Sequence, residues 1–383
     1  RQCCRHRMGR RGVEAGVRVG WLKQFATEYC AGLSTLDVVL KVVKTHTLEM
    51  LCRYVDILKP GDTGRAQYFF SHTWAAPFND LVAAAGHVCS DDDFVWIDIF
   101  AVLQHTEGIT KQQEKEKEQD LDFHIVVRSC KALILVAQHI PTVAGMNRND
   151  AIKKLVPPEA KKSCAFFRVW CIVELLAARD GELPTIMLVG NADSSLRFRT
   201  NDAMLDNLLW MMDIEQASAS YDADRVRILE QVRQFPGFVA ANQSFKGAVA
   251  GAMRGCMNQP AVIRAALGDV GPLSRLSSEQ DLAGAIHGAA AAGLMGPLQM
   301  LLQRGVSVDM RGQYEMTPLI SAAQAGQVKV VHALLGLRAD PNAKTCHGVK
   351  AIDEATVHGH TEVVQLLQQA GSGNVDVRLH AKR

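Results

Sequence analysis

One acidic residue interrupts an otherwise apolar helical segment. Residues 169–178 read VWCIVELLAA, and Glu174 is the one ionisable group there besides the Cys171 thiol. No basic residue lies three or four positions away, so no local cation pairs with the carboxylate. Burying such a group carries a desolvation cost unless another element satisfies it. Glu174 is therefore a candidate functional acid. The alternative is a structural acid paired across to an arginine such as Arg128 or Arg168.

Three more polar residues lie where predicted strands end. Ser71 and His72 end an aromatic strand, and Asp98 ends a second strand. Parallel sheets place their ligands at the carboxyl ends of strands, so these side chains are candidate binding residues. Two of them have structural alternatives, because Asp98 can cap a turn or helix and His72 can be a satisfied interior histidine. A Ser71–His72 nucleophilic pair is disfavoured, because adjacent strand residues point to opposite faces.

Strands and helices alternate around these residues. The sequence predicts strands at 65–72, 94–99, 132–137 and 185–189, and helices at 79–87, 123–130 and around Glu174. The strands are continuous apolar runs without the period-two alternation of a half-exposed sheet. This α/β pattern predicts a parallel sheet with helices on both faces.

Residues 65–190 resemble a divergent Toll/interleukin-1 receptor (TIR) domain. The segments that carry the resemblance are YFFS at 68–71, WID at 96–98, the strands at 132–137 and 185–189, and WCxxEL at 170–175. The resemblance implies a flavodoxin-like, TIR-type sheet that self-associates into homo-oligomers. It also places a substrate-gating loop at 103–122.

In TIR enzymes the glutamate of that helix cleaves NAD, so the resemblance implies that Glu174 is catalytic. Cleavage of the nicotinamide–ribose bond passes through an oxocarbenium-like state that one carboxylate can stabilise. Trp74 or Trp170 can stack on a flat ring, although Trp170 can equally be a core residue. The residues expected to bind substrate are Ser71, His72, Trp74, Asp98 and Trp170. NAD is then a substrate, and no cofactor or metal is expected.

The C-terminal region contains a 33-residue internal repeat. Gly293, Gly326 and Gly359 recur at this period, and so do Leu301, Leu334 and Leu367. The middle copy contains TPL at 317–319, and the pattern resembles the ankyrin repeat. This resemblance predicts three copies in an all-α solenoid over 281–373 that binds a protein partner.

The remaining chain is divided by composition. We expect a disordered basic arm at 1–20, a helical lead-in at 21–64, the TIR-like domain at 65–199 and a helical bridge at 200–270. Helices are predicted at 203–214, 224–234 and 244–257. The mixed charge run at 111–118 predicts a solvated helix or a mobile loop.

Bulk composition excludes several classes of protein. The formal net charge of +2 gives no general case for nucleic-acid binding. The ten cysteines lack the paired short spacings of a zinc site, and their scatter favours a reducing, cytoplasmic compartment. No apolar run is long enough to span a membrane.

Two functions are consistent with the sequence. In the first, the ankyrin repeats bind a partner and the TIR-like domain hydrolyses NAD. In the second, the protein is a signalling scaffold whose TIR-like domain only self-associates. An open cleft containing Glu174, Ser71 and Asp98 favours the enzyme, and a sealed ion pair favours the scaffold.

Overall fold

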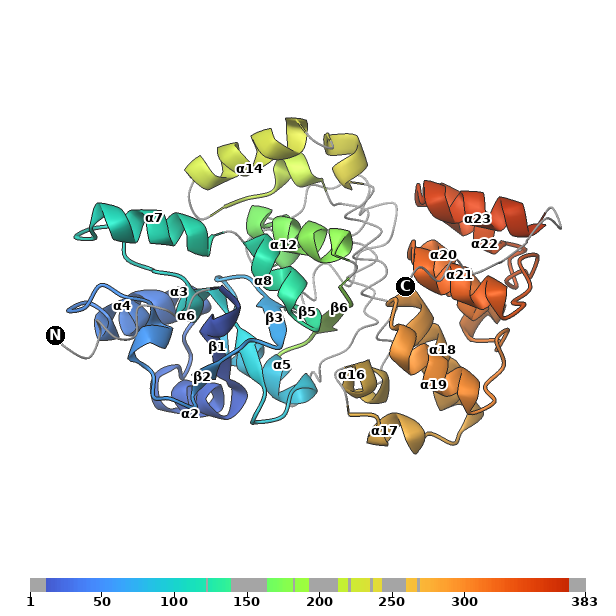
Figure 1. Cartoon of the computed structure of the whole chain (residues 1–383), viewed down its shortest axis with the longest axis horizontal. Helices are drawn as coiled ribbons and strands as arrows, with labels where there is room; N and C mark the ends of the chain where they lie inside the picture. The colour runs from blue at the N-terminus through green and yellow to red at the C-terminus, as the bar shows by residue number, and fades with distance from the viewer. Residues whose placement is uncertain are drawn as a thin grey trace, which may run out of the picture. The chain divides into compact units, whose positions relative to one another are not determined.

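The chain forms two compact units, Arg1–Phe238 and Val239–Arg383. A computed structural model describes residues 12–121, 123–138, 164–181, 183–192, 213–219, 222–234, 237–242, 260–266 and 269–371. The first unit contains a sheet with surrounding helices, and the second contains stacked helix pairs (Figure 1).

The first unit is built on a six-stranded sheet in the order β2-β1-β4-β3-β5-β6. Its strands are β1 (Gly16–Arg18), β2 (Thr63–Gly64), β3 (Tyr68–Ser71), β4 (Phe94–Trp96), β5 (Ala132–Ala137) and β6 (Thr185–Val189). The four predicted strands are β3 to β6, and they are parallel to one another. Numbered among themselves along the chain, they lie in the order 2-1-3-4, as in the flavodoxin-type arrangement.

The prediction of a purely parallel sheet is wrong at one edge. β1 pairs antiparallel with both β4 and β2, which makes the sheet mixed. These strands have three and two residues, too few to give an alternation signal in the sequence. A Cβ at Gly16 would lie 2.9 Å from the carbonyl oxygen of Gly64, so the close pairing depends on glycine.

Helices cover both faces of the sheet, as the sequence predicted. α8 (Phe123–Ser129) packs with α12 (Val169–Asp180) on one face, and α2 (Val19–Tyr29) packs with α5 (Phe78–Val88) on the other (Figure 1). The remaining helices of this unit include α3 (Thr35–Val38), α4 (Lys44–His46), α6 (Asp98–Ala101), α7 (Lys111–Asp120) and α14 (Asp222–Gln234).

The segment predicted as a separate helical lead-in belongs to the α/β unit. β2 lies within residues 21–64 and β1 within residues 1–20, and both join the sheet. In addition, the rings of Trp21 and Phe25 lie 5.3 and 5.2 Å from the ring of Phe100. The sheet and this aromatic core therefore extend across the boundary that was predicted at residue 65.

Two other predictions have different outcomes. The charge run forms the helix α7, and Thr110 caps its N-terminus by accepting a hydrogen bond from the Gln113 amide. α14 matches the helix predicted at 224–234. The helices predicted at 203–214 and 244–257 lie almost entirely outside the described residues.

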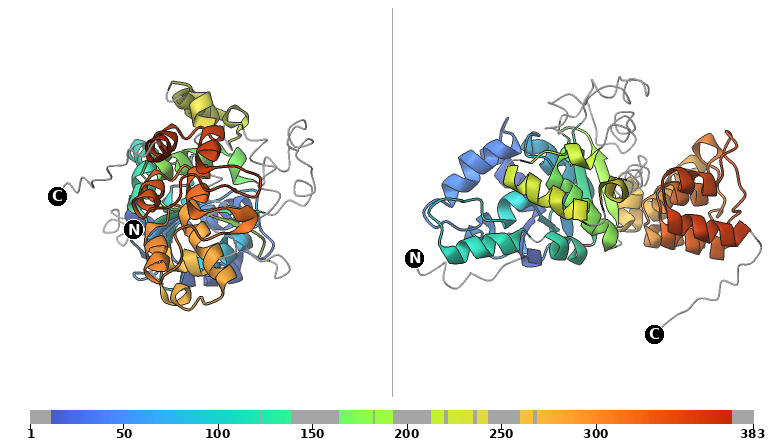
Figure 2. Two further views of the ribbon diagram at one scale, coloured as in Figure 1. Left: turned by 90° about the vertical axis from the view of Figure 1, so that its right-hand side faces the viewer. Right: turned by 90° about the horizontal axis from the view of Figure 1, so that it is seen from above.

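The second unit contains three helix pairs that recur every 33 residues. The pairs are α18 (Glu279–Ala291) with α19 (Met295–Gln303), α20 (Pro318–Gln324) with α21 (Val328–Gly336), and α22 (Ala351–Val357) with α23 (Thr361–Gly371). Successive first helices contact one another, so the pairs stack (Figure 2). Gly293, Gly326 and Gly359 have φ values of 73°, 71° and 74°, which favour glycine between the two helices of a pair.

The core of the second unit extends one step before the repeats. Val262 on α16 (Pro260–Ala266) and Leu273 on α17 (Gly271–Ser274) belong to the same buried cluster as Leu301 and Leu334. α16 lies in the segment that was predicted as a bridge at 200–270, whereas both short helices share the core of the repeats. Among the described residues, no helix is long and apolar enough to cross a membrane.

Candidate functional site

The parallel pairing of β3 and β4 brings their carboxyl ends to one edge of the sheet. Ser71 is the last residue of β3, and Asp98 begins α6 directly after the end of β4. Glu174 lies on α12, close enough to both residues to interact with them electrostatically. The predicted juxtaposition of Ser71, Asp98 and Glu174 is therefore present.

Four buried polar atoms in this region lack a hydrogen-bond partner. They are Ser71 Oγ, His72 Nε2, Asp98 Oδ1 and Glu174 Oε2, and we refer to these four residues as the strand-end cluster. Ser71, His72 and Glu174 are buried, with exposed fractions of 1%, 9% and 6%. Buried polar atoms in proteins are nearly always paired, so a group of unpaired ones indicates a place for water or a polar ligand.

The surroundings of Glu174 disfavour its charged form. Burial raises the pKa of its carboxyl well above the usual range. The Ser71 hydroxyl lowers this pKa, Asp98 raises it and Arg168 lowers it. Ser71 Oγ faces Glu174 without meeting hydrogen-bond geometry, since both Ser71 Oγ and Glu174 Oε2 remain unpaired. Burial and Asp98 therefore favour the neutral carboxyl of Glu174, whereas Ser71 and Arg168 favour the ionised one.

His72 is held as a neutral ring. Burial lowers its pKa, whereas Asp98 and a hydrogen bond to the Phe70 carbonyl raise it. Its Nε2 lies 4.0 Å from Asp98 Oδ1. Ser71 Oγ and His72 Nε2 are both unpaired, which agrees with the expectation that they form no nucleophilic pair.

Trp74 and Trp170 have different surroundings. Trp74 Nε1 donates a 2.8 Å hydrogen bond to Asp98 Oδ2, so it orients the carboxylate. Trp170 packs edge-on against Phe123 at 5.2 Å, and the Arg227 guanidinium lies 5.4 Å from its ring centre. Those contacts place the half-buried Trp170 ring between α12 and its neighbouring helices.

Two residues near the cluster were not predicted as site residues. Cys171 Sγ donates a 3.5 Å hydrogen bond to the His72 carbonyl, and its thiol pKa is raised by burial. Arg168 affects the electrostatics of both His72 and Glu174. Their positions three and six residues before Glu174 were the available signal. Asp98, by contrast, does not cap α6, because the helix has no side-chain cap.

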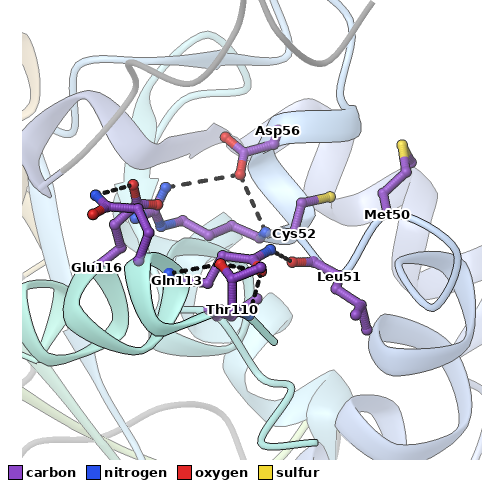
Figure 3. A pocket seen from close by; sticks show the side chains of 10 residues that line it. Met50, Leu51, Cys52, Asp56, Thr110, Gln113 and Glu116 are labelled. Carbon is purple, nitrogen blue, oxygen red and sulfur yellow. Dashed lines mark hydrogen bonds and ion pairs between the residues drawn. The ribbon is translucent and has the colours of Figure 1, made fainter. Parts of the chain in front are cut away.

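A second polar feature lies beside α7. A cavity of about 290 Å³ is lined by residues from the 50–56 segment and from α7, including Asp56 and Glu116 (Figure 3). Arg53, which also lines the cavity, makes a two-pronged ion pair with Asp120, at 2.6 and 2.8 Å. This pair fixes the C-terminal end of α7. Within the described parts of the chain, no group of three or more side chains could hold a metal ion.

Residues 286–378 match the family model of ankyrin repeats, in three copies. The match covers the three helix pairs, so the predicted repeat family and copy number are confirmed. An ankyrin-repeat solenoid supports a role in protein interaction.

Two curated proteins are similar to part of the chain. The chain is 34% identical over 106 residues to the "Probable E3 ubiquitin-protein ligase XBOS31" of Oryza sativa subsp. japonica, across 26% of this chain and 23% of that protein. It is 29% identical over 106 residues to the "Inactive serine/threonine-protein kinase TEX14" of Mus musculus, across 28% of this chain and 7% of that protein. The chain therefore spans about a quarter of the first relative and less than a tenth of the second.

Proposed function

We propose that this protein is an NAD hydrolase whose ankyrin repeats bind the partner that locates or clusters it. The observation that carries the catalytic part of the proposal is the strand-end cluster. It contains four buried and unpaired polar atoms, and one of them is an oxygen of the Glu174 carboxyl. The cluster lies where parallel sheets bind ligands. The TIR resemblance of residues 65–190 supplies NAD as the substrate, and free cysteines agree with a cytoplasmic location.

The proposed reaction breaks the bond between C1′ of the ribose and the nicotinamide nitrogen. The electron pair of that bond goes to the ring, which leaves as neutral nicotinamide. Water adds to C1′ and releases a proton, giving ADP-ribose. Because the leaving group is already cationic, no general acid is needed, and Glu174 acts by stabilising positive charge on the ribose.

The raised pKa of Glu174 has a direct consequence for this mechanism. Only the ionised carboxylate stabilises an oxocarbenium-like state, whereas burial favours the neutral acid. The cationic nicotinamide ring of bound NAD favours ionisation. Turnover is therefore expected to rise with pH through the raised pKa of Glu174.

Nicotinamide release tests the catalytic proposal. Purified protein is incubated with NAD at high protein concentration, and wild type is compared with Glu174→Gln, which preserves the shape of the side chain. Glu118→Gln is the matched control, because Glu118 is exposed on α7. We expect release by wild type and by the control, and loss of release in Glu174→Gln.

The alternative is a scaffold in which the α/β unit self-associates without catalysis. The 6% exposure of Glu174 and the nearby Arg168 favour it. Absence of nicotinamide release from wild type, even when the protein is forced to cluster, would support this alternative and leave Glu174 as a structural acid.

A further inference from the structure

The unpaired atoms of His72 and Asp98 define the kind of chemical group that pairs with both. The His72 ring donates to the Phe70 carbonyl, and Nε2 is the ring nitrogen without a partner. In a neutral imidazole only one nitrogen carries hydrogen, so Nδ1 is the donor and Nε2 is a bare acceptor. The facing Asp98 Oδ1 also accepts and has no partner.

Two acceptors therefore face each other across 4.0 Å without a hydrogen between them. Asp98 does not turn away, because its other oxygen accepts the 2.8 Å hydrogen bond from Trp74 Nε1. His72 is fixed as well, with its side chain 4% exposed. Such an arrangement is unfavourable unless a donor bridges the two atoms. A hydroxyl has one hydrogen and satisfies one acceptor, whereas a water or an –NH₂ group satisfies both.

We propose that His72 Nε2 and Asp98 Oδ1 bind the primary carboxamide of the nicotinamide ring, one hydrogen to each. The inference rests on the proposed function, since NAD brings the carboxamide, and it makes these residues determinants of specificity. Nicotinic acid adenine dinucleotide has a carboxylate in place of the carboxamide. Its oxygens would face two acceptors, one of them charged. A site built to bind N–H groups rejects an analogue that lacks them strongly, so we expect a preference for NAD on the order of 100-fold or more.

The test compares kcat/KM for NAD and for nicotinic acid adenine dinucleotide, in wild type and in Asp98→Asn. The amide of the variant keeps an acceptor for Trp74 and can turn its own hydrogens toward a carboxylate. We therefore expect the roughly 100-fold preference of wild type to fall at least about tenfold in Asp98→Asn.

Equal turnover of the two dinucleotides by wild type would overturn the inference while leaving NAD hydrolysis intact, and so would an unchanged preference in Asp98→Asn. Cleavage of neither dinucleotide would overturn the proposed function. Calorimetric titration of wild type with each dinucleotide then decides the inference by itself. Tighter binding of NAD by a similar ratio would support it, and equal affinity or no binding of either would show that the gap holds only water.

Discussion

Removal of the Asp120 carboxylate should destabilise the first unit more than removal of an exposed charge does. The Arg53 and Asp120 side chains are 6% and 4% exposed, and two hydrogen bonds of 2.6 and 2.8 Å join them. In Asp120→Ala the guanidinium stays buried, and its remaining acidic neighbours are Asp56, at 3.8 Å, and Glu116. Breaking a buried pair in this way costs about 3–5 kcal/mol of the free energy of unfolding.

Urea unfolding followed by tryptophan fluorescence measures this loss of stability in the first unit of the chain. All five tryptophans lie before residue 239, so their emission reports the first unit alone. With a urea dependence of about 3 kcal/mol per molar, the midpoint should fall by roughly 1 M or more. The double variant Arg53→Met with Asp120→Leu should lose less than the two single changes together, because neither charge is left buried.

Glu230→Ala is the matched control. The Glu230–Arg233 pair joins atoms 3.5 Å apart on side chains that are 50% and 67% exposed. Its loss should cost less than about 1 kcal/mol. If Asp120→Ala were no more destabilising than this control, the reasoning that α7 is fixed by a buried ion pair would be refuted.

Three further outcomes follow from burial and charge. Because the folded-state pKa of Glu174 is raised, its contribution to stability is complete below the unfolded pKa and is lost as pH rises through the folded one. The melting temperature of Glu174→Gln should therefore exceed that of wild type increasingly as pH rises, and parallel curves would contradict this. His287 is buried with a lowered pKa, and it bonds Ser321 Oγ at 2.8 Å, so the repeats should lose stability as pH falls through its folded pKa. Far-UV circular dichroism checks this, and a pH-independent second unit would oppose it. Leu334→Ala, at a fully buried position, should cost about 2–5 kcal/mol in the same assay, whereas Leu337→Ala, at a position 54% exposed, should cost little.

Most of the fold could be predicted from the sequence where an element is long or repeated. The apolar runs of β5 and β6 and the 33-residue recurrence of Gly293, Gly326 and Gly359 each gave a strong periodic or continuous signal. β1 and β2 gave none, because three and two residues are too few to show alternation. Antiparallel pairing of such short strands depends on neighbours that are distant in the sequence.

The candidate site was predictable in part for a related reason. Ser71 and Asp98 could be assigned to one edge because parallel strands align their carboxyl ends, whereas Glu174, on a helix, was linked to this site by the TIR resemblance. The role of Trp170 depended on which helix packs against its ring, and a single helix does not encode the position of Phe123. The 4.0 Å gap between His72 and Asp98 likewise arises from side-chain orientations on separate elements, so it is visible only in the folded chain.

The most direct test of the central claim is the rate of nicotinamide release from NAD by wild type and by Glu174→Gln, measured side by side on clustered protein. The account predicts measurable release by wild type and a loss on the order of 100- to 1,000-fold in the variant, the size expected when one electrostatic stabiliser of a transition state is removed. Equal release by both proteins, with the variant folded, would contradict a catalytic role for Glu174. Release by neither would contradict NAD hydrolysis itself.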